Sequence, residues 1–298
     1  MSTPEAQSAD ERVIVVTGGN RGIGFALVEV LADQGHRVIF TARDPARGFE
    51  ALRRLTDAGP RRSITMEICD LASPSSIHAC AQRLVDGGEP IDALINNAGI
   101  LRPPDIREVT AEGVEATLAT NALGPLALTT ELEPILAAAP TARVLILTSR
   151  LHQPGSHGEP VDFSFEDPNL EHGYSPDRAY KNSKLAGIWV STELNRRLPP
   201  TVTADAICPG FVPTTAAGYT TGWHRFLLRR ILPRLSFTTT VEQAAADVAW
   251  ALDAPELAGS GGRYLADRQV AEPSNDARDT GLARRFWELA TTLWPSYA

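Results

Sequence analysis

Short apolar segments alternate with helical patterns along most of the chain, and this alternation limits the possible folds more than any other feature. Residues 13–16, 37–41 and 143–148 are largely apolar and rich in β-branched residues, as strands are. Helical spacing of apolar residues at 45–58 and 177–197 lies between such runs. Apolar strands separated by helices predict a parallel sheet that is covered on both faces. We therefore expect an α/β, Rossmann-like doubly wound parallel sheet.

No internal repeat, low-complexity tract or linker divides the chain, so we expect a single domain over 13–298. The polar residues 1–12 are expected to form a disordered tail, because they lack the apolar core of a secretory signal. Irregular additions are expected near 151–178 and 213–240. The further expected elements are strands at 64–68 and 93–95 and helices at 25–31, 77–85, 110–138 and 282–293.

The composition narrows the class of protein. The formal net charge of −8 argues against a nucleic-acid-binding protein, which needs a strongly basic face. Cys69, Cys80 and Cys208 are too few and too scattered for a disulfide framework or a zinc site, and they indicate a reduced, intracellular compartment. No run approaches the roughly 18 apolar residues that cross a bilayer. We therefore expect a cytoplasmic protein.

A glycine-rich turn follows the first expected strand. Gly18, Gly22 and Gly24 give the spacing G-x-x-x-G-x-G, which differs from the commonest dinucleotide fingerprint, G-x-G-x-x-G. Residues without Cβ let backbone N–H groups approach a pyrophosphate, and the next helix offers its positive end. A purely structural turn is the alternative, but a turn after the first strand of a βαβ unit favours nucleotide binding. The expected contacts in this turn are Gly18, Asn20, Arg21, Gly22, Ile23 and Gly24.

The end of the second expected strand bears on which nucleotide binds. NAD sites usually have an acidic residue here that holds the ribose 2′-hydroxyl, whereas this chain has Ala42 and then Arg43. Arg21 and Arg47 point to the same region, and guanidinium groups suit a 2′-phosphate. Asp44 keeps NAD open as an alternative. We expect NADP(H).

Tyr180 and Lys184 are four residues apart in an expected helix, which places both side chains on one face. A free tyrosine has a pKa near about 10, and a nearby ammonium group lowers the pKa of a tyrosine toward the range of acid–base catalysis. Such a pair also occurs by chance. It gains weight because Ser149 ends the clearest strand, at the edge where doubly wound sheets bind ligands.

These residues together resemble the short-chain dehydrogenase/reductase family over roughly 13–265. Within the family, the chain is most similar to the carbonyl reductase and retinol dehydrogenase-like branch. The motifs that carry the resemblance are Thr17-Gly18-x-x-x-Gly22-x-Gly24, Thr41-Ala42-Arg43-Asp44, Asn96-Asn97-Ala98-Gly99, Asn121-Ala122-Leu123-Gly124-Pro125, Thr148-Ser149, Tyr180-x-x-x-Lys184, and Pro209-Gly210 followed by Val212 and Thr214.

The resemblance implies a role for each matching residue. Tyr180 would exchange a proton with the substrate oxygen, and Lys184 would lower the pKa of Tyr180 and bind the nicotinamide ribose. Ser149 would hold the carbonyl oxygen, and Asn121 would hold a water in the proton relay to Lys184. The residues that would contact the cofactor elsewhere are Asp70, Leu71, Asn97, Ala98, Gly99, Pro209, Gly210, Val212 and Thr214.

Two segments depart from the family pattern or allow a second interpretation. Ser149 and Tyr180 are 31 positions apart, much more than is usual in the family, so the 151–178 insertion either closes over substrate or blocks a subunit interface. The basic amphipathic stretch 223–235 fits a substrate lid better than a membrane-surface helix. His152, His157 and His172 match no strong metal-ligand spacing, and we expect no metal.

These observations predict an NADP(H)-dependent oxidoreductase that interconverts a carbonyl and an alcohol on a fairly apolar small molecule. The alternatives are an NAD-dependent alcohol dehydrogenase and a non-redox protein of the same fold, such as a lyase or cyclase, a nucleotide sensor or a scaffold. Nucleic acid and membrane are not expected as partners. The sequence leaves the choice between monomer and homo-oligomer open.

Overall fold

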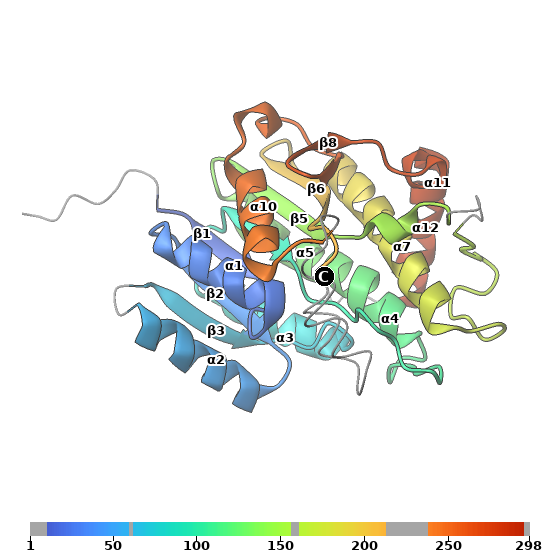
Figure 1. Ribbon diagram of the computed structural model, residues 1–298, viewed down its shortest axis with the longest axis horizontal. Helices are drawn as coiled ribbons and strands as arrows, with labels where there is room; N and C mark the ends of the chain where they lie inside the picture. The colour runs from blue at the N-terminus through green and yellow to red at the C-terminus, as the bar shows by residue number, and fades with distance from the viewer. Residues whose placement is uncertain (1–10, 60–61, 156–160, 213–237, 295–298) are drawn as a thin grey trace, which may run out of the picture.

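The computed structural model describes residues 11–59, 62–155, 161–212 and 238–294, and one sheet of eight strands runs through them (Figure 1). The strands are β1 (Val13–Val16), β2 (Arg37–Ala42), β3 (Ile64–Ile68), β4 (Ala93–Asn96), β5 (Ala142–Leu147), β6 (Val202–Cys208), β7 (Tyr264–Ala266) and β8 (Gln269–Ala271). Their order is β3-β2-β1-β4-β5-β6-β7-β8, and every neighbouring pair is parallel except β7 and β8. The expected doubly wound parallel sheet is confirmed.

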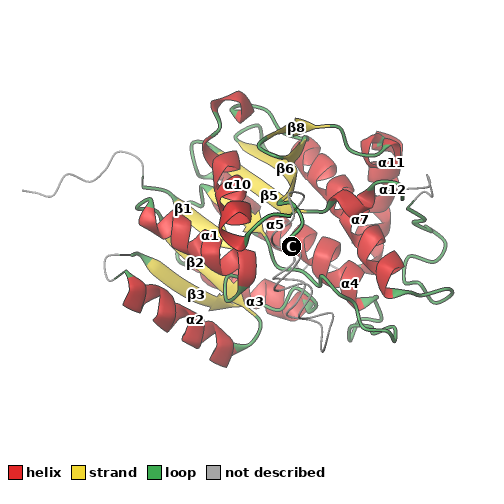
Figure 2. Ribbon diagram, in the orientation of Figure 1, coloured by secondary structure: helices red, strands yellow, loops and turns green. Residues whose placement is uncertain are grey.

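Helices cover both faces of this sheet (Figure 2). The α-helices are α1 (Gly22–Asp33), α2 (Pro45–Ala58), α3 (Pro74–Asp86), α4 (Ala116–Leu118), α5 (Gly124–Glu131), α6 (Glu133–Ala137), α7 (Pro176–Arg197), α10 (Val241–Asp253), α11 (Asn275–Arg278) and α12 (Thr280–Leu293). Shorter turns are the π-helical η1 (Ala119–Leu123) and the 3₁₀-helical η2 (Arg150–His152) and η5 (Pro255–Leu257). Two hydrophobic cores follow, one beneath α1, α2 and α10 and the other beneath α3, α5, α7 and α12.

β1 shows why the strands are apolar along their whole length. All four of its residues are buried. Successive side chains of a strand point to opposite faces. Ile14 and Val16 accordingly join the core beneath α1, and Val13 and Val15 join the core beneath α7. The strand order also reverses beside β1, because the chain goes from β1 outward to β3 and then returns to β4 on the other side. The carboxyl ends of β1 and β4 form a topological switch point, where ligands bind in such sheets.

The long helix expected at 110–138 is wrong in its start and its continuity. Thr110 to Gly113 form a turn, in which Gly113 has a φ of +82°, and the helix begins only at Ala116. It then passes through the π-helical turn η1 and ends at Glu131. Pro134 lacks the N–H group that would continue the helical bonding, so α6 starts as a separate short helix. β6, β7, β8 and α10 have no counterpart among the elements expected from the sequence.

The amino-terminal boundary also differs from expectation. The carbonyl of Arg12 accepts a hydrogen bond of 3.0 Å from the Arg37 N–H, next to the pairing of β1 with β2. The Arg12 guanidinium forms an ion pair with Asp253 at the end of α10. Arg12 is therefore part of the fold, and residues 1–10 of the expected tail lie outside the described residues.

The described part of the 151–178 insertion packs against α7 and α12. Phe163 lies edge-to-face against Trp189 of α7 at 5.2 Å and against Phe286 of α12 at 5.5 Å between ring centroids. The Tyr174 hydroxyl donates a hydrogen bond of 2.7 Å to the carbonyl of Pro104. The insertion is thereby attached to the loop that follows β4. The expected lid at 213–240 and the stretch 223–235 lie almost wholly outside the described residues.

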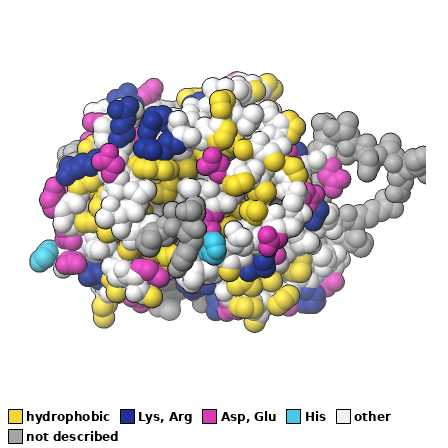
Figure 3. Space-filling model, turned by 180° about the vertical axis from the view of Figure 1, so that it is seen from behind, with side chains coloured by type: hydrophobic (Ala, Val, Ile, Leu, Met, Phe, Trp, Pro, Cys, Tyr) yellow, Lys and Arg dark blue, Asp and Glu magenta, His cyan; other side chains and the backbone are white. Residues whose placement is uncertain are grey.

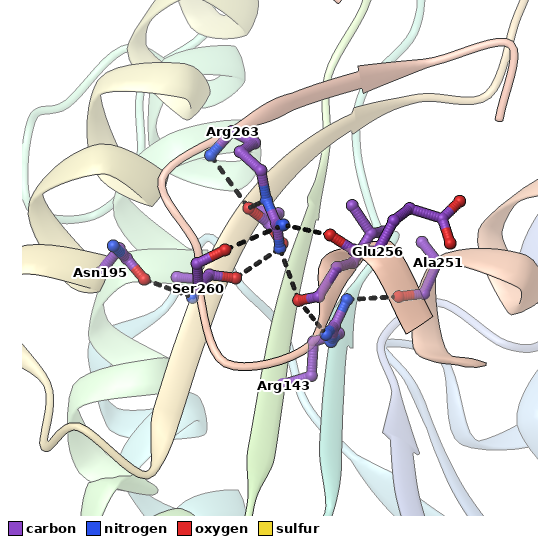
Figure 4. A network of polar contacts seen from close by, with 9 residues as sticks. Arg143, Asn195, Ala251, Glu256, Ser260 and Arg263 are labelled. Atoms are coloured by element: carbon purple, nitrogen blue, oxygen red, sulfur yellow. Dashed lines mark hydrogen bonds and ion pairs between the residues drawn. The ribbon is translucent and has the colours of Figure 1, made fainter. Parts of the chain in front are cut away.

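A network of polar contacts lies at the amino edge of the sheet (Figure 4). Arg143, near the start of β5, donates hydrogen bonds of 2.7 Å to the carbonyls of Ala251 and Leu257. Arg263, just before β7, binds the fully buried Asp205 of β6 through its backbone N–H and two guanidinium nitrogens, at 2.9–3.1 Å. Burial lowers the pKa of Arg143. The network fastens the end of α10 and the 255–263 loop to the central strands.

The helices, the possible metal ligands and the surface charges can be compared with the expected lack of membrane, metal and nucleic-acid binding. None of the described helices is long and apolar enough to span a membrane. Within the described part of the chain, no three His, Cys, Asp or Glu side chains are grouped as metal ligands. Figure 3 shows the face opposite to Figure 1, on which hydrophobic, acidic and basic side chains are interspersed. The expectations that neither a metal nor a nucleic acid binds stay predictions.

Candidate active site

The glycine turn connects β1 to α1 at the carboxyl edge of the sheet. Gly18 has a φ of +68°, which favours glycine. A Cβ on Gly24 would lie 2.4 Å from the carbonyl oxygen of Gly18, so only glycine fits there. α1 begins at Gly22, immediately after the turn, and the first amides of an α-helix have no intrahelical acceptor. The turn therefore has the form expected of a phosphate-binding loop.

The loop after β4 is bonded to this turn. The Asn97 side-chain amide donates to the carbonyls of Thr17 at 2.8 Å and Gly18 at 3.3 Å. The Ala98 N–H donates to the Thr17 hydroxyl at 3.0 Å. Residues that are 80 positions apart in the sequence thus form one surface across the switch point between β1 and β4.

An arginine and an aspartate, Arg43 and Asp44, follow the end of β2. Ala42 is buried, whereas Arg43 is exposed, and within the described residues its guanidinium has no ion-pair partner. Asp44 caps α2 by accepting a hydrogen bond of 3.1 Å from the Arg47 N–H. The Asp44 carboxylate also pairs with the Arg47 guanidinium at 3.6 Å. This arrangement commits Asp44 to the helix and makes Arg43 the more available of the two arginines.

The predicted cofactor segment after β3 lies at the same edge of the sheet. Asp70 and Leu71 follow β3, and the Asp70 carboxylate accepts a hydrogen bond of 3.0 Å from the N–H of Ala72. A Cβ on Gly124 would lie 2.4 Å from the carbonyl oxygen of Leu71, so this loop packs closely on the start of α5.

The Pro209–Gly210 turn follows β6 at this edge. Gly210 has a φ of +82°, and a Cβ on it would lie 2.3 Å from the hydroxyl of Thr239. The Thr239 N–H donates a hydrogen bond of 2.8 Å to the Phe211 carbonyl. Val212 is buried beside the turn. Thr214, which the sequence also assigns to the cofactor site, lies outside the described residues.

The π-helical turn η1 positions Asn121. Its side chain accepts from the Ile100 N–H at 2.7 Å and donates to the Ile100 carbonyl at 3.0 Å and to the Ser183 hydroxyl at 2.9 Å. A Cβ on Gly99 would lie 3.0 Å from the Asn121 amide oxygen and 3.7 Å from the Lys184 Nζ. The predicted residues Gly99, Asn121 and Lys184 therefore lie together. The Asn121 side chain is held by the Ile100 backbone and by Ser183, and its predicted role in holding a water stays a prediction.

Ser149, Tyr180 and Lys184 also come together, although the insertion separates them in sequence. Ser149 lies just beyond β5, and its side chain forms a hydrogen bond with Tyr180. Lys184 Nζ donates a hydrogen bond of 2.9 Å to the carbonyl of Leu147, the last residue of β5. The same nitrogen lies 5.6 Å from the centre of the Tyr180 ring. Both Tyr180 and Lys184 are buried.

The electrostatics of this pair differ from the expectation. Burial raises the pKa of Tyr180 to about 12, and the hydrogen bond with Ser149 opposes this only in part. Burial likewise lowers the pKa of Lys184 to about 8. The predicted lowering of the tyrosine pKa by the lysine is therefore wrong for this structure, because desolvation of the phenol dominates. Tyr180 is a protonated phenol at neutral pH.

Sequence reasoning missed Ser183, which lies between the two. Its hydroxyl donates 2.8 Å to the Tyr180 carbonyl and accepts from Asn121, so it joins η1 to α7. Ser183 is fully buried, and its place three residues after Tyr180 and one before Lys184 is the signal that could have identified it.

Comparisons with known proteins agree with the resemblance seen in the sequence. Human retinol dehydrogenase 14 is 33% identical over 300 residues, covering 95% of this chain and 86% of the relative. Mouse polyprenol dehydrogenase is 36% identical over 284 residues, covering 93% and 82%. A crystal structure of a protein from Mycobacterium Paratuberculosis has a TM-score of 0.73 and 30% identity, covering 97% of this chain and 95% of that one.

A family model described as short chain dehydrogenase matches residues 12–161, from Arg12 before β1 to Val161 within the insertion. That range includes the glycine turn, the Asn97 loop and Ser149. Members of this family are oxidoreductases that use nicotinamide cofactors. The relatives match over nearly the whole length of the chain, and the sheet order and the site at the switch point agree with them. The chain belongs to the short-chain dehydrogenase family.

Proposed function

We propose that this protein is an NADP(H)-dependent oxidoreductase that interconverts a carbonyl and an alcohol on a fairly apolar small molecule. The observation that carries the proposal is the grouping of Ser149, Tyr180 and Lys184 at the end of β5. The glycine turn lies at the same edge of the sheet, where ligands bind in this architecture.

The chemical groups at this edge suit a dinucleotide. The amides at the start of α1 and the glycine turn suit a pyrophosphate. Arg43 suits a ribose 2′-phosphate, because a guanidinium group binds phosphate with two parallel hydrogen bonds. Asp44 is committed to capping α2, which weakens the case for the NAD alternative. When bound, the nicotinamide supplies or accepts the hydride.

The side chains of this protein would transfer the proton between Tyr180 and the substrate oxygen. In the reductive direction, the substrate oxygen would accept hydrogen bonds from the Tyr180 and Ser149 hydroxyls, and Tyr180 would transfer its proton to that oxygen. A tyrosine with a pKa of about 12 holds its proton at neutral pH, and an alkoxide is a stronger base than a phenolate. Lys184, whose amine is already desolvated, would bind the nicotinamide ribose and remain near the tyrosine ring.

The relatives support an apolar substrate. Retinol and polyprenol, which give two of them their names, are apolar alcohols. In this chain Phe211, next to the Pro209–Gly210 turn, is 44% exposed at the same edge as the proposed site. A large exposed apolar side chain beside a site of this kind suits an apolar ligand. A cytoplasmic location and a single domain over 13–298 stay predictions.

The test is a turnover assay with both cofactors. Purified protein would be incubated with NADPH or NADH and a panel of aldehydes, ketones and quinones that includes retinal and a short polyprenal, and the loss of reduced cofactor would be followed by absorbance. We expect turnover with at least one apolar carbonyl and a preference for NADPH. Binding of NADPH without turnover of any carbonyl or alcohol would instead favour a non-redox protein of this fold.

A further inference from the structure

His152 is a buried histidine in the turn η2 that follows Ser149. Its side chain is 1% exposed, and both ring nitrogens have backbone partners. Nδ1 lies 2.6 Å from the Ser149 carbonyl oxygen, and Nε2 lies 3.2 Å from the Ser274 nitrogen. A backbone N–H can only donate, so Nε2 accepts a hydrogen bond and Nδ1 carries the proton. The contacts therefore specify a neutral imidazole with one tautomer.

The ring connects two parts of the molecule that are far apart in sequence. On one side it holds the carbonyl of Ser149, at the carboxyl end of β5. On the other side it binds Ser274, the residue that caps α11, and it packs edge-to-face on Tyr264 of β7 with centroids 4.8 Å apart. An ion pair between Arg150 and the β7–β8 turn reinforces the same attachment. The first residues of the insertion are thus fastened to the carboxyl-terminal part of the fold.

The position of Ser149 depends on this attachment. Ser149 lies beyond the last residue of β5, so strand pairing does not fix it. Its carbonyl accepts from the His152 ring and, at 3.2 Å, from the His152 backbone N–H. Its hydroxyl accepts from the Leu151 N–H at 3.2 Å and bonds with the Tyr180 side chain. A shift in the carbonyl would rotate the peptide and move the hydroxyl away from Tyr180.

We propose that His152 is a positioning residue for Ser149, acting as a neutral imidazole between the Ser149 carbonyl and the Ser274 amide. The inference rests on the proposed function, since it assigns to Ser149 the task of holding the substrate oxygen. It also gives a reason why a long insertion between Ser149 and Tyr180 is compatible with their contact. The insertion begins with the turn η2, in which the buried His152 ring is hydrogen-bonded to Ser149 on one side and to Ser274 on the other.

The first experiment uses two substitutions of nearly equal size at position 152. In His152→Asn, the side-chain amide nitrogen occupies a place close to that of Nδ1 and donates to the Ser149 carbonyl. His152→Leu has a similar shape and no donor. We expect kcat to fall about tenfold or more in His152→Leu but only severalfold in His152→Asn, which keeps the bond to Ser149 and loses the bond to Ser274. The KM for NADPH should change little in both variants. Equal kcat values in the two variants would overturn the proposal.

The second experiment removes the other partner. Ser274 has a φ of −61°, which proline adopts, and its hydroxyl caps α11 by accepting from the Ala277 N–H. Ser274→Pro removes both the N–H and the cap, whereas Ser274→Ala removes the cap alone. We expect a severalfold lower kcat in Ser274→Pro than in Ser274→Ala. Equal kcat values with intact folding would show that the Ser274 amide plays no part in positioning Ser149.

A third measurement does not depend on turnover. Nitrogen NMR of the ¹⁵N-labelled histidine rings, with His152→Asn to assign the signal, reports which nitrogen carries the proton. We expect the neutral Nδ1–H form in the protein without cofactor. The opposite tautomer or a charged ring at neutral pH would overturn the proposed contacts. An inactive wild-type protein with the expected tautomer would instead mean that the proposed function, and with it the role given to Ser149, is wrong.

Discussion

The two edges of the sheet hold their buried ionisable groups in different ways. At the amino edge, the carboxylate of Asp205 is fully buried and accepts two guanidinium hydrogen bonds from Arg263, of 3.1 and 3.0 Å. At the carboxyl edge, Lys184 is buried against a backbone carbonyl, and Tyr180 has only the Ser149 side chain to oppose its desolvation. The Asp205 carboxylate thus has an ionic partner, whereas within the described residues neither Lys184 nor Tyr180 has one.

This difference separates stability from chemistry. A buried charge with a complete set of partners fixes the surrounding backbone, and it does not gain or lose a proton near neutral pH. A buried titratable group without an ionic partner has a shifted pKa and gains or loses a proton when a ligand changes its surroundings. Substitutions at the two edges should therefore affect different quantities.

The largest expected effect is on turnover at the carboxyl edge. Tyr180→Phe keeps the packing of the ring and removes the hydroxyl, so the rate should fall by about 10²–10⁴-fold. NADPH affinity and the urea midpoint should remain close to those of the parent. Initial rates, cofactor titration and urea unfolding measure the three quantities separately. Retention of more than about a tenth of the parental rate would mean that Tyr180 is not the proton donor.

The matching substitution at the amino edge should act on stability. Asp205→Ala leaves the guanidinium of Arg263 partly buried without its carboxylate, and removal of one partner of such a pair costs about 3–5 kcal/mol of unfolding free energy. Urea unfolding at pH 7 measures the loss. The turnover number of the remaining folded protein at low temperature should be near that of the parent. A variant of normal stability with a lowered turnover number would contradict the division between the edges.

Replacing Lys184 should have a smaller effect, on the free energy of unfolding, and this effect should depend on pH. Its pKa is about 8 in the folded protein against an ordinary value of 10.5, so the unfolded chain binds more protons between these pH values. The stability of the parent should therefore rise with pH over that range through this group. Lys184→Met should be more stable than the parent by roughly 1–3 kcal/mol below pH 8, and this difference should shrink toward pH 10.5. A difference that stays constant from pH 7 to 10 would show that burial of the charge has no such cost.

The smallest expected effect concerns the cofactor. NADPH should bind about tenfold more tightly than NADH, which corresponds to about 1.4 kcal/mol. Arg43→Ala should remove most of this preference and change NADH affinity little, because the guanidinium would contact only the 2′-phosphate. Fluorescence titration with both cofactors provides the measurement, and Arg47→Ala is the control, since Arg47 is already paired with Asp44. An unchanged preference in Arg43→Ala would assign the discrimination to other residues.

The sequence predicts the central strands β1, β4 and β5 because they are buried on both faces, which leaves apolar runs that are visible without the structure. It also predicts which chemical groups meet at the carboxyl edge, because parallel strands bring their ends together. It does not predict the pKa of Tyr180, since desolvation depends on side chains from several elements. The contact of Ser183 with Asn121 and that of His152 with Ser274 were not predicted, because these partners lie 62 and 122 positions apart in the sequence.

The π-helical turn η1 gives the helix that contains Asn121 one residue more than a regular α-helix of the same rise would hold. Each residue of an α-helix adds a rotation of about 100°, so the faces of α4 and α5 are out of phase across the turn. Deleting one residue beside Asn121 would bring them into phase and restore uninterrupted i→i−4 bonding. Such a deletion would turn the Asn121 amide away from Ile100 and Ser183. In an evolutionary sense, the extra residue is an insertion that only the site gives a reason to keep.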